Sequence, residues 1–308
     1  MNVALIGSVS SSVTALGALI DAGIEMTAVL GLEESRAPYV SDYQSLEPLA
    51  LQGGIPFQSF ISVTDPKVAS FLEAHRPDLL WCIGLSQLIP ERLIESARHG
   101  GVGFHPTMLP RGRGRAPVAW TILLKEQAAV SLFHLSDEPD AGDIIAQREV
   151  AVAPDDYAED LIARTNDVLR DVIMDLGPSL KTGTLPRTPQ DHRRATCYAK
   201  RTPADGLIHW SLSTDRIHRL VRAAGSPYPG AFTFLGETKL TIWRAELACS
   251  RELADLEAPG CQPGIIIRID PARGPLVRTA DGGLWLTKTT GVDWATIQPG
   301  DRALSQMS

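Results

Sequence analysis

The sequence predicts an α/β domain built on a parallel sheet, followed by a smaller antiparallel β-barrel. In the first half of the chain, short apolar runs alternate with longer amphipathic segments, as in a parallel sheet flanked by helices. In the last third, short runs of β-forming residues are separated by turn signals, which is typical of a small barrel. These two textures predict two domains of different architecture.

Expected strands and helices alternate through the first half. The strands are Asn2–Gly7, Met26–Leu32, Asp78–Gly84, Gly101–His105, Ala129–Leu135 and Asp143–Val152. The helices are Val13–Ala22, Lys67–His75, Ala116–Lys125 and Tyr157–Leu180. The run DLLWCIG is unbroken in its apolar character, which suits a strand covered on both faces. The last of these helices has a long helical periodicity and is expected to close the first domain.

The second half is expected to contain short strands and one helix. The strands are GLIHW, AFTF, TKLTIW, GIIIRID, PLVRT and GLWLTK, and the helix is Thr214–Ala224. The segment before them, KTGTLPRTPQDHRRA, is rich in proline, threonine and charge and has no periodicity, as in a linker. We therefore expect a first domain over residues 1–190, a linker over 191–204 and a barrel domain over 205–308.

Composition and charge exclude several classes of protein. The start, MNVALIGSVSSS, has no basic region and only a short apolar run, so it reads as a buried strand rather than a signal peptide. No apolar run approaches the roughly 18 residues needed to cross a bilayer. The formal charge of −7 gives no general attraction to nucleic acid or to an anionic membrane. We expect a soluble cytoplasmic protein without membrane or nucleic-acid partners.

The cysteines predict neither disulfides nor a metal site. Cys82, Cys197, Cys249 and Cys261 are widely scattered and form no CxxC pair. This spacing argues against a disulfide framework and against a structural zinc site. We expect ordinary thiols and no bound metal.

Three segments follow expected strands, at the edge of a parallel sheet where ligands gather. They are Gly84–Pro90, His105–Pro117 and Asp137–Asp143. His105 lies at a strand end in a turn bounded by proline, and imidazole exchanges protons near neutrality. The third segment offers two carboxylates, Asp140 and Asp143, and a carboxylate beside an imidazole can orient the ring. A histidine and an aspartate could thus act as base and orienter.

These motifs resemble the folate-dependent formyltransferase family. Its members carry Asn-x-His, then Leu-Pro-x-x-Arg-Gly-x-x-Pro, then Asp-x-Gly, and this chain has FHPTMLPRGRGRAP followed by DAGDIIAQ. ATCYAKRTPADGLIHW and SPYPGAF resemble the entrance to the small C-terminal domain of methionyl-tRNA and sugar-nucleotide formyltransferases. The long, multi-part spacing makes the resemblance specific. It implies a Rossmann-like catalytic domain followed by an OB-like β-barrel, and it makes a homodimer through the barrel plausible.

The resemblance also implies a reaction and a set of site residues. The reaction is transfer of a formyl group from the co-substrate 10-formyltetrahydrofolate to a primary amine. His105 matches the catalytic histidine and Asp140 the catalytic aspartate. The residues that match the folate-binding segments are Gly84, Gln87, Leu88, Ile89, Ser136, Asp137, Glu138 and Asp140.

The chain departs from the family at the asparagine position, which is occupied by Gly103. In the family this asparagine and the protonated histidine hold the tetrahedral oxyanion, and loss of one such donor commonly costs about 100- to 1000-fold in rate. Three explanations remain open. His105 alone could supply the donor, another group could replace the amide, or the protein could bind without efficient turnover. The GFHP motif looks like that of some sugar-pathway formyltransferases, which favours an active enzyme.

The acceptor is expected to be an amino-sugar nucleotide. Segment 32–52, where the methionyl-tRNA enzymes carry a basic insertion, has four acidic residues against Arg36, and this sign repels phosphate. The GRGRAP turn looks like that of the enzyme that formylates UDP-4-amino-4-deoxy-L-arabinose. Arg113 or Arg115 could bind a diphosphate, and Pro106 and Thr107 are expected to lie at the acceptor.

Three other functions are less well supported. A dinucleotide-dependent oxidoreductase would need a GxGxxG turn, and the first turn here is GSVSSS. A methionyl-tRNA formyltransferase is the main alternative among enzymes. A folate- or nucleotide-binding homologue that has lost catalysis is the alternative outside enzymes, because Gly103 could mark the loss.

Overall fold

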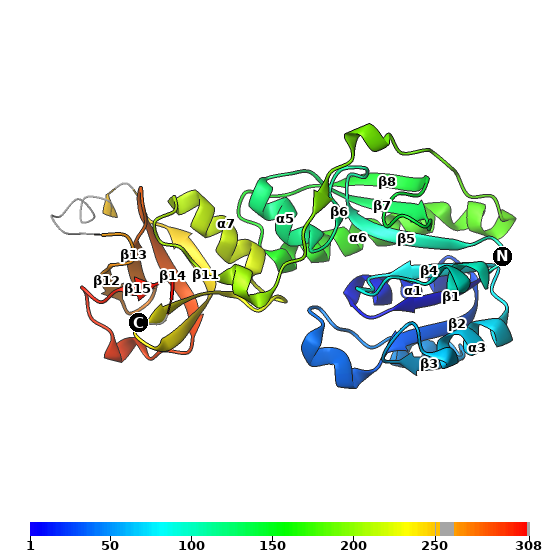
Figure 1. Ribbon diagram of the computed structural model, residues 1–308, viewed down its shortest axis with the longest axis horizontal. Coiled ribbons are helices and arrows are strands. Elements are labelled where there is room, and N and C mark those ends of the chain that lie inside the picture. The colour runs from blue at the N-terminus through cyan, green and yellow to red at the C-terminus, as the bar shows by residue number, and fades with distance from the viewer. Residues whose placement is uncertain (250, 253–261, 307–308) are drawn as a thin grey trace. The chain divides into compact units, whose positions relative to one another are not determined.

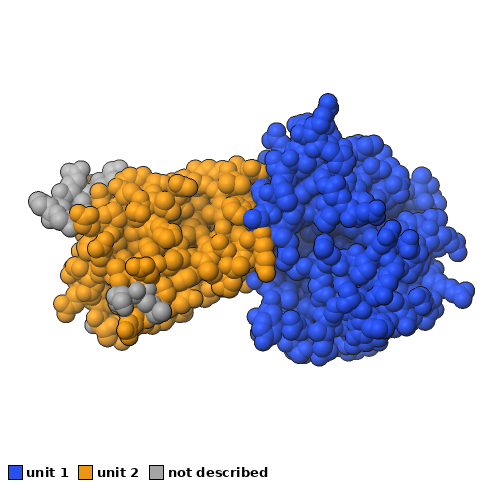
Figure 2. Space-filling model, viewed as in Figure 1, with its two compact units in different colours: residues 1–117, 127–152, 162–199 blue, residues 118–126, 153–161, 200–308 orange. Residues whose placement is uncertain are grey.

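The computed structural model describes residues 1–249, 251–252 and 262–306, and these residues form two compact units. The first unit comprises residues 1–117, 127–152 and 162–199 (Figure 2). The second comprises residues 118–126 and 153–161 together with the described residues from 200 onward. The domain boundaries at residues 190 and 204 stay predictions.

A seven-stranded sheet forms the centre of the first unit, in the order β3-β2-β1-β4-β5-β7-β8 (Figure 1). The strands are β1 Asn2–Gly7, β2 Glu25–Leu32, β3 Phe57–Phe60, β4 Leu79–Ile83, β5 Gly101–Thr107, β7 Ala128–His134 and β8 Ile144–Val150. All five residues of β4 are buried, in agreement with its unbroken apolar sequence. The chain leaves β1 in opposite directions toward β2 and β4, so the crevice expected at such a switch point lies at the carboxyl ends of these strands.

The sheet is parallel from β3 to β5 but not throughout. β5 pairs with β7 in antiparallel fashion, and β7 pairs with β8 in the same way. The parallel pairing expected of the sheet therefore does not extend to its last two strands. Apolar periodicity identifies a strand but carries no information on its direction. The fold class, an α/β domain followed by an antiparallel barrel-like domain, is confirmed.

Helices and short 3-10 turns connect the strands. They are α1 Ser10–Asp21, η1 Glu34–Tyr39, α2 Glu47–Gln52, α3 Pro66–His75, α4 Glu91–Glu95, α5 Pro117–Leu124, α6 Ala158–Thr182 and η2 His192–Arg194. α3 begins as its sequence suggests, because Asp65 accepts the backbone N–H of Lys67 and Pro66 occupies the first turn. Within the described ranges, no helix combines the length and the apolar character that a membrane span requires.

The second unit contains a curled antiparallel sheet and the helix α7 Thr214–Ala224. Its order is β12-β13-β14-β11-β10-β15. The strands are β10 Ala231–Leu235, β11 Thr238–Leu247, β12 Ile266–Asp270, β13 Gly274–Arg278, β14 Gly283–Thr290 and β15 Ala303–Leu304. Ala303 N–H donates to Gly264 O at 2.8 Å, which brings the two ends of this order together.

One expected strand of this unit is wrong. GLIHW contributes a single bridge residue, Leu207, which pairs with Phe232. The preceding residues, Pro203–Gly206, form the 3-10 turn η3. Ile208 and Trp210 are nevertheless buried in the core of the unit, so the apolar pattern reports burial and not an extended ladder.

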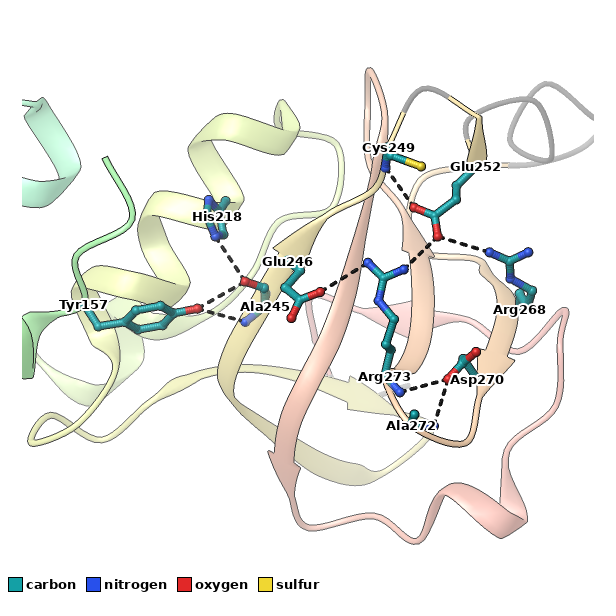
Figure 3. A network of polar contacts seen from close by, with 10 residues as sticks. All are labelled: Tyr157, His218, Ala245, Glu246, Cys249, Glu252, Arg268, Asp270, Ala272 and Arg273. Atoms are coloured by element: carbon teal, nitrogen blue, oxygen red, sulfur yellow. Dashed lines mark hydrogen bonds and ion pairs between the residues drawn. The ribbon is translucent and has the colours of Figure 1, made fainter. Parts of the chain in front are cut away.

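Two side chains of the second unit, Tyr157 and Asp281, form hydrogen bonds to the backbone of distant segments. Tyr157 is buried, and its hydroxyl donates to Ala245 O and accepts Ala245 N–H (Figure 3). Asp281 accepts the N–H of Thr214 at 2.7 Å, which satisfies a free donor at the start of α7. Burial raises the pKa of the Tyr157 phenol, so this group stays a hydroxyl at neutral pH.

Glu252 is the centre of a charged network on the same unit (Figure 3). Its carboxylate accepts the Cys249 N–H at 2.8 Å and bonds to Arg273 at 2.8 Å and to Arg268 at 3.4 Å. Arg273 in turn lies over the Trp285 ring at 4.4 Å from its centroid. The Cys249 hydrogen bond and the neighbouring arginine lower the pKa of Glu252 to about 2 from 4.5.

We expect Glu252→Gln to destabilise the protein in a manner that depends on pH. A lowered carboxyl pKa contributes stability above the unfolded value of 4.5, and this contribution is lost as the pH falls toward 2. The difference in free energy of unfolding between wild type and Glu252→Gln should therefore be constant near neutrality and narrow below about pH 4.5. Urea unfolding followed by tryptophan fluorescence at several pH values measures this, and a difference that stays constant to pH 3 would contradict it.

Candidate active site

His105 lies in the last part of β5 and is buried. Its Nε2 is 2.7 Å from the carbonyl oxygen of Gly112, and because a carbonyl can only accept, Nε2 carries the proton. The other ring nitrogen, Nδ1, is 3.7 Å from Oδ1 of Asp140. The histidine and aspartate that the motifs single out are therefore neighbours, and Nδ1 is the nitrogen that faces the carboxylate.

Asp140 follows an antiparallel strand, so the rule that site residues follow the carboxyl ends of parallel strands does not explain its position. Because β7 is antiparallel, its end lies level with the start of β5, where Leu135 N–H donates to Gly101 O at 2.8 Å. The following turn runs back along β5 and brings Asp140 to the site. Asp143, the other carboxylate offered by the sequence, pairs instead with Arg187 at 3.5 Å.

The conformation of Asp140 is unusual. Its φ of 57° lies in the left-handed region, which costs a non-glycine residue on the order of 1–3 kcal/mol and persists only where the surroundings enforce it. One enforcing contact is made by the side chain of Asp140, because its Oδ2 accepts the Gly114 N–H at 2.9 Å. With Oδ2 held in this way, Oδ1 is the oxygen that faces His105.

The GRGRAP turn needs its glycines because another strand lies against it. β6 (Arg113–Gly114) pairs in parallel with β9 (Cys197–Tyr198). Gly114 has a φ of 103°, and a Cβ there would lie 2.5 Å from the Tyr198 carbonyl oxygen. Any side chain at this position would displace the N–H that holds Asp140.

Gln190 is a site residue that the sequence analysis missed. Its side chain is buried, and its Nε2 donates to Asp140 O at 2.9 Å and to Gly142 O at 2.7 Å. Its Oε1 accepts a hydrogen bond from Arg113 at 2.8 Å. It is far along the chain from the turn it contacts and lies within a segment that has no periodicity, so no local pattern could have indicated this role.

Arg113 is not free to bind a substrate phosphate. It is 6% exposed, and besides Gln190 its guanidinium contacts Glu138 at 3.2 Å and His192 Nδ1 at 3.2 Å. Arg115, two residues further on, is exposed. Of the two arginines expected at the acceptor, the structure thus commits Arg113 to the protein interior and leaves Arg115 at the surface.

The position of the family asparagine is closed by apolar side chains. Gly103 pairs with Phe133 across the β5–β7 ladder. A Cβ at Gly103 would lie 2.6 Å from Phe133 Cζ and 2.9 Å from Leu135 Cδ2. An asparagine would therefore have to displace the Phe133 ring before its amide could reach the site.

The expected folate segment after β4 begins next to His105 and Asp140. The parallel register pairs Cys82 with Gly103, which sets Gly84 level with His105. Gly84 has a φ of 63°, and a Cβ there would lie 2.3 Å from Val9 Cγ2, so the close approach of the first turn requires glycine. This segment therefore starts at the carboxyl edge of the sheet.

Further along this segment, the side chains have different surroundings. Gln87 accepts Val63 N–H at 2.9 Å and donates to Ile61 O, which anchors the segment to the protein. Leu88 is 76% exposed, and Ile89 packs against the core of the first unit. Leu88 is therefore the residue of this group that is open to a ligand.

The second expected folate segment borders a cavity of about 360 Å³. Ser136, Asp137 and Glu138 are exposed and line this cavity together with Arg187 and other residues of the turn. Glu138 is also the ion-pair partner of Arg113. Burial lowers the pKa of His134, another residue that lines the cavity, so this imidazole is neutral at physiological pH.

The remaining expected residues are Pro106, Thr107 and the cysteines. Thr107 is buried, and its hydroxyl donates to Arg111 O at 2.8 Å, while Pro106 is partly exposed. Among the described residues, no group of three or more His, Cys, Asp or Glu side chains could hold a metal ion. Cys82 is buried, Cys197 and Cys249 are exposed free thiols, and Cys261 lies outside the described residues.

Comparison with protein families identifies the class of this enzyme. Residues 13–175 match the formyl transferase family, and residues 200–294 match the formyl transferase C-terminal domain. The chain therefore belongs to the formyl transferase family. The resemblance that the His105 and Asp140 motifs indicate is confirmed at this level.

Solved structures with the same fold include three kinds of protein. An N-formyltransferase from Helicobacter canadensis, in complex with folinic acid and dTDP-3-aminofucose, is 15% identical over 94% of this chain and 99% of its own, with a TM-score of 0.67. HypX from Aquifex aeolicus, in complex with tetrahydrofolic acid, is 19% identical over 94% of this chain, with a TM-score of 0.67. The match covers 44% of HypX, so this chain spans less than half of its length. A methionyl-tRNA formyltransferase from Clostridium thermocellum is 21% identical over 80% of this chain and 94% of its own, with a TM-score of 0.57.

We expect Gly103→Asn to lower stability, because the new side chain meets the Phe133 ring. Overpacking of this kind typically costs about 1–3 kcal/mol. Thermal unfolding measures the loss. Adding Gly103→Asn to Phe133→Ala should lower the melting temperature less than adding Gly103→Asn to wild type does. A Gly103→Asn protein with the melting temperature of wild type would show that the site tolerates the family amide.

Proposed function

We propose that this enzyme transfers a formyl group from 10-formyltetrahydrofolate to the primary amine of an amino-sugar nucleotide. The observation that carries the proposal is the buried His105–Asp140 pair at the carboxyl edge of the parallel strands, in a chain of the formyl transferase family. Solved relatives of the same fold hold tetrahydrofolic acid or folinic acid, which supports a folate as the formyl donor.

The geometry suggests a role for each member of the pair. The acceptor amine attacks the formyl carbon, and the tetrahedral intermediate then breaks its bond to N10 of the folate. Since Nε2 of His105 is occupied by Gly112 O, the proton that can reach the oxyanion is the one on Nδ1 of the imidazolium. Asp140 faces this nitrogen and accepts, through a water, the proton that the attacking amine loses, and the same water returns this proton to N10 as N10 leaves.

The surroundings of Gly103 favour an active site adapted to work without the amide. Phe133 and Leu135 fill the space that an asparagine would need, whereas simple loss of the amide would leave a gap. In a water-poor site, the remaining donor acts in a low dielectric, where each hydrogen bond to a developing charge is worth more than in water. This packing supports catalysis that relies on His105.

An amino-sugar nucleotide is favoured over tRNA as the acceptor. Segment 32–52 is acidic, and Asp42 within it accepts hydrogen bonds from the start of α1 rather than presenting a surface for phosphates. The Helicobacter canadensis enzyme of the same fold binds dTDP-3-aminofucose. Arg115 is the exposed cation that we assign to the diphosphate, because Arg113 is buried in contacts with the protein.

A formyl-transfer assay tests this function. Purified protein is given 10-formyltetrahydrofolate and a panel of amino-sugar nucleotides, with Met-tRNA as the competing acceptor. We expect turnover on a sugar nucleotide, and we expect His105→Ala to reduce it by about 100- to 10,000-fold. His99→Ala, which removes an exposed histidine outside the site, is the matched control and should leave the rate unchanged. Folate binding without transfer to any acceptor would refute the proposed activity.

We expect Arg115→Gln to weaken binding of the sugar nucleotide without slowing the chemical step. A hydrogen bond to a charged group is worth about 1.5–3 kcal/mol, so KM for the nucleotide should rise about tenfold or more while kcat stays near that of wild type. Steady-state kinetics with varied acceptor measure both constants. Arg111→Gln removes an exposed arginine from the same turn and serves as the control for loss of charge. Equal effects of the two substitutions would argue against a specific phosphate contact.

A further inference from the structure

We propose that Gln190 is a positioning residue that holds Asp140 in its catalytic orientation. This inference rests on the proposed function of the His105–Asp140 pair and adds a residue to it. Gln190 does not touch either ring nitrogen of His105 in the structure. It acts instead on the backbone of the turn that carries Asp140, by donating to Asp140 O and to Gly142 O.

The amide of Gln190 can occupy its place in only one orientation. Arg113 offers N–H groups and no acceptor, so it must face the amide oxygen. The carbonyls of Asp140 and Gly142 offer acceptors and no donor, so they must face the amide nitrogen. The three partners together use both hydrogens and the oxygen of this amide, and a carboxylate or a hydrocarbon of equal size could not satisfy them.

Gln190 is itself held in place by its own segment and by Arg113. Two residues earlier, Thr188 exchanges two backbone hydrogen bonds with Ile144, at 2.8 and 3.0 Å, just beyond the Asp140 turn. On the other side, Arg113 belongs to β6, whose next residue, Gly114, binds the carboxylate of Asp140. The turn is thus held from two directions, at its carbonyls by Gln190 and at its carboxylate by Gly114.

The turn has little freedom to find another conformation that keeps Asp140 in place. Asp140 is in the left-handed region, and a Cβ on Gly142 would lie 1.7 Å from the carbonyl oxygen of His134. Without the two donors of Gln190, the part-buried carbonyls of Asp140 and Gly142 lose these partners and the strained residue can relax. Oδ1 of Asp140 would then leave its position 3.7 Å from His105.

The experiment compares Gln190→Glu with wild type in single-turnover reactions with enzyme in excess. Glutamate keeps the size of the side chain and an acceptor for Arg113, and loses the donors to Asp140 and Gly142. We expect the first-order rate constant to fall about 100-fold, as misplacement of a catalytic group by about 1 Å does. A role in folding alone would lower the fraction of folded enzyme, and at saturating folded enzyme it would leave this rate constant unchanged.

Asp191→Asn is the matched control, because Asp191 is the next residue and its exposed side chain accepts hydrogen bonds from the backbone and guanidinium of Arg193. Its rate constant should equal that of wild type. Hydrogen exchange of peptides that cover residues 136–142 gives a second readout that needs no substrate. We expect faster exchange in Gln190→Glu than in wild type or Asp191→Asn.

The outcomes separate failure of this inference from failure of the proposed function. If wild type transfers formyl groups, His105→Ala is inactive and Gln190→Glu stays within about threefold of wild type, the positioning role is overturned. If wild type transfers formyl groups to no acceptor, the proposed function fails, and the exchange measurement alone decides whether Gln190 holds the turn. Unchanged exchange over residues 136–142 would overturn the inference in that case.

Discussion

A hydrogen bond between the backbone N–H of Gly114 and the carboxylate of Asp140 joins the two halves of the active site. The first half is the turn after β5, which also supplies the carbonyl of Gly112 to His105. The second half is the turn after β7, which carries Asp140 in a strained backbone conformation. The bond requires a residue without a side chain at position 114, because β9 lies directly against it. Folding of distant segments around this contact therefore sets the position of Asp140 relative to His105.

The sequence predicts the parts of this site that lie in local motifs. His105, Asp140 and the GRGRAP turn can be identified because turns and strand ends leave signals over a few residues. The direction of β7 leaves no such signal, and Asp140 reaches the site although the strand-end rule does not apply to it. Gln190 and the β6–β9 pairing depend on contacts between segments far apart in sequence. In GLIHW a local pattern was misleading, because its apolar residues are buried although the segment forms only one β-bridge.

The replacement of the family asparagine by Gly103 involves a second residue, Phe133. An asparagine at this position and a phenylalanine at position 133 exclude each other, since the two side chains would occupy the same space across the ladder. The glycine and the phenylalanine must therefore be considered as a pair. On the proposed function, replacing a polar donor by a packed ring removes one hydrogen bond to the oxyanion but also removes a group that would need a partner between turnovers. The demand on His105 becomes correspondingly greater.

Two arginines that differ by two positions in one short turn have opposite environments. Arg113 is buried and bonds to Glu138 and Gln190, so its charge organises the turn that carries Asp140. Arg115 is exposed and its charge is available to a ligand. In sequence both are cations in a glycine-rich turn at the edge of a sheet, and residue type alone assigns them the same role. The backbone bonds to β9 through both residues, because Arg115 N–H still donates to Tyr198 O at 3.1 Å, yet the side chain of Arg113 is buried and that of Arg115 is exposed. On the proposed function, an arginine that orients Asp140 thus lies beside one that can recognise the substrate, and a change in acceptor could arise at Arg115 without disturbing the chemistry at Asp140.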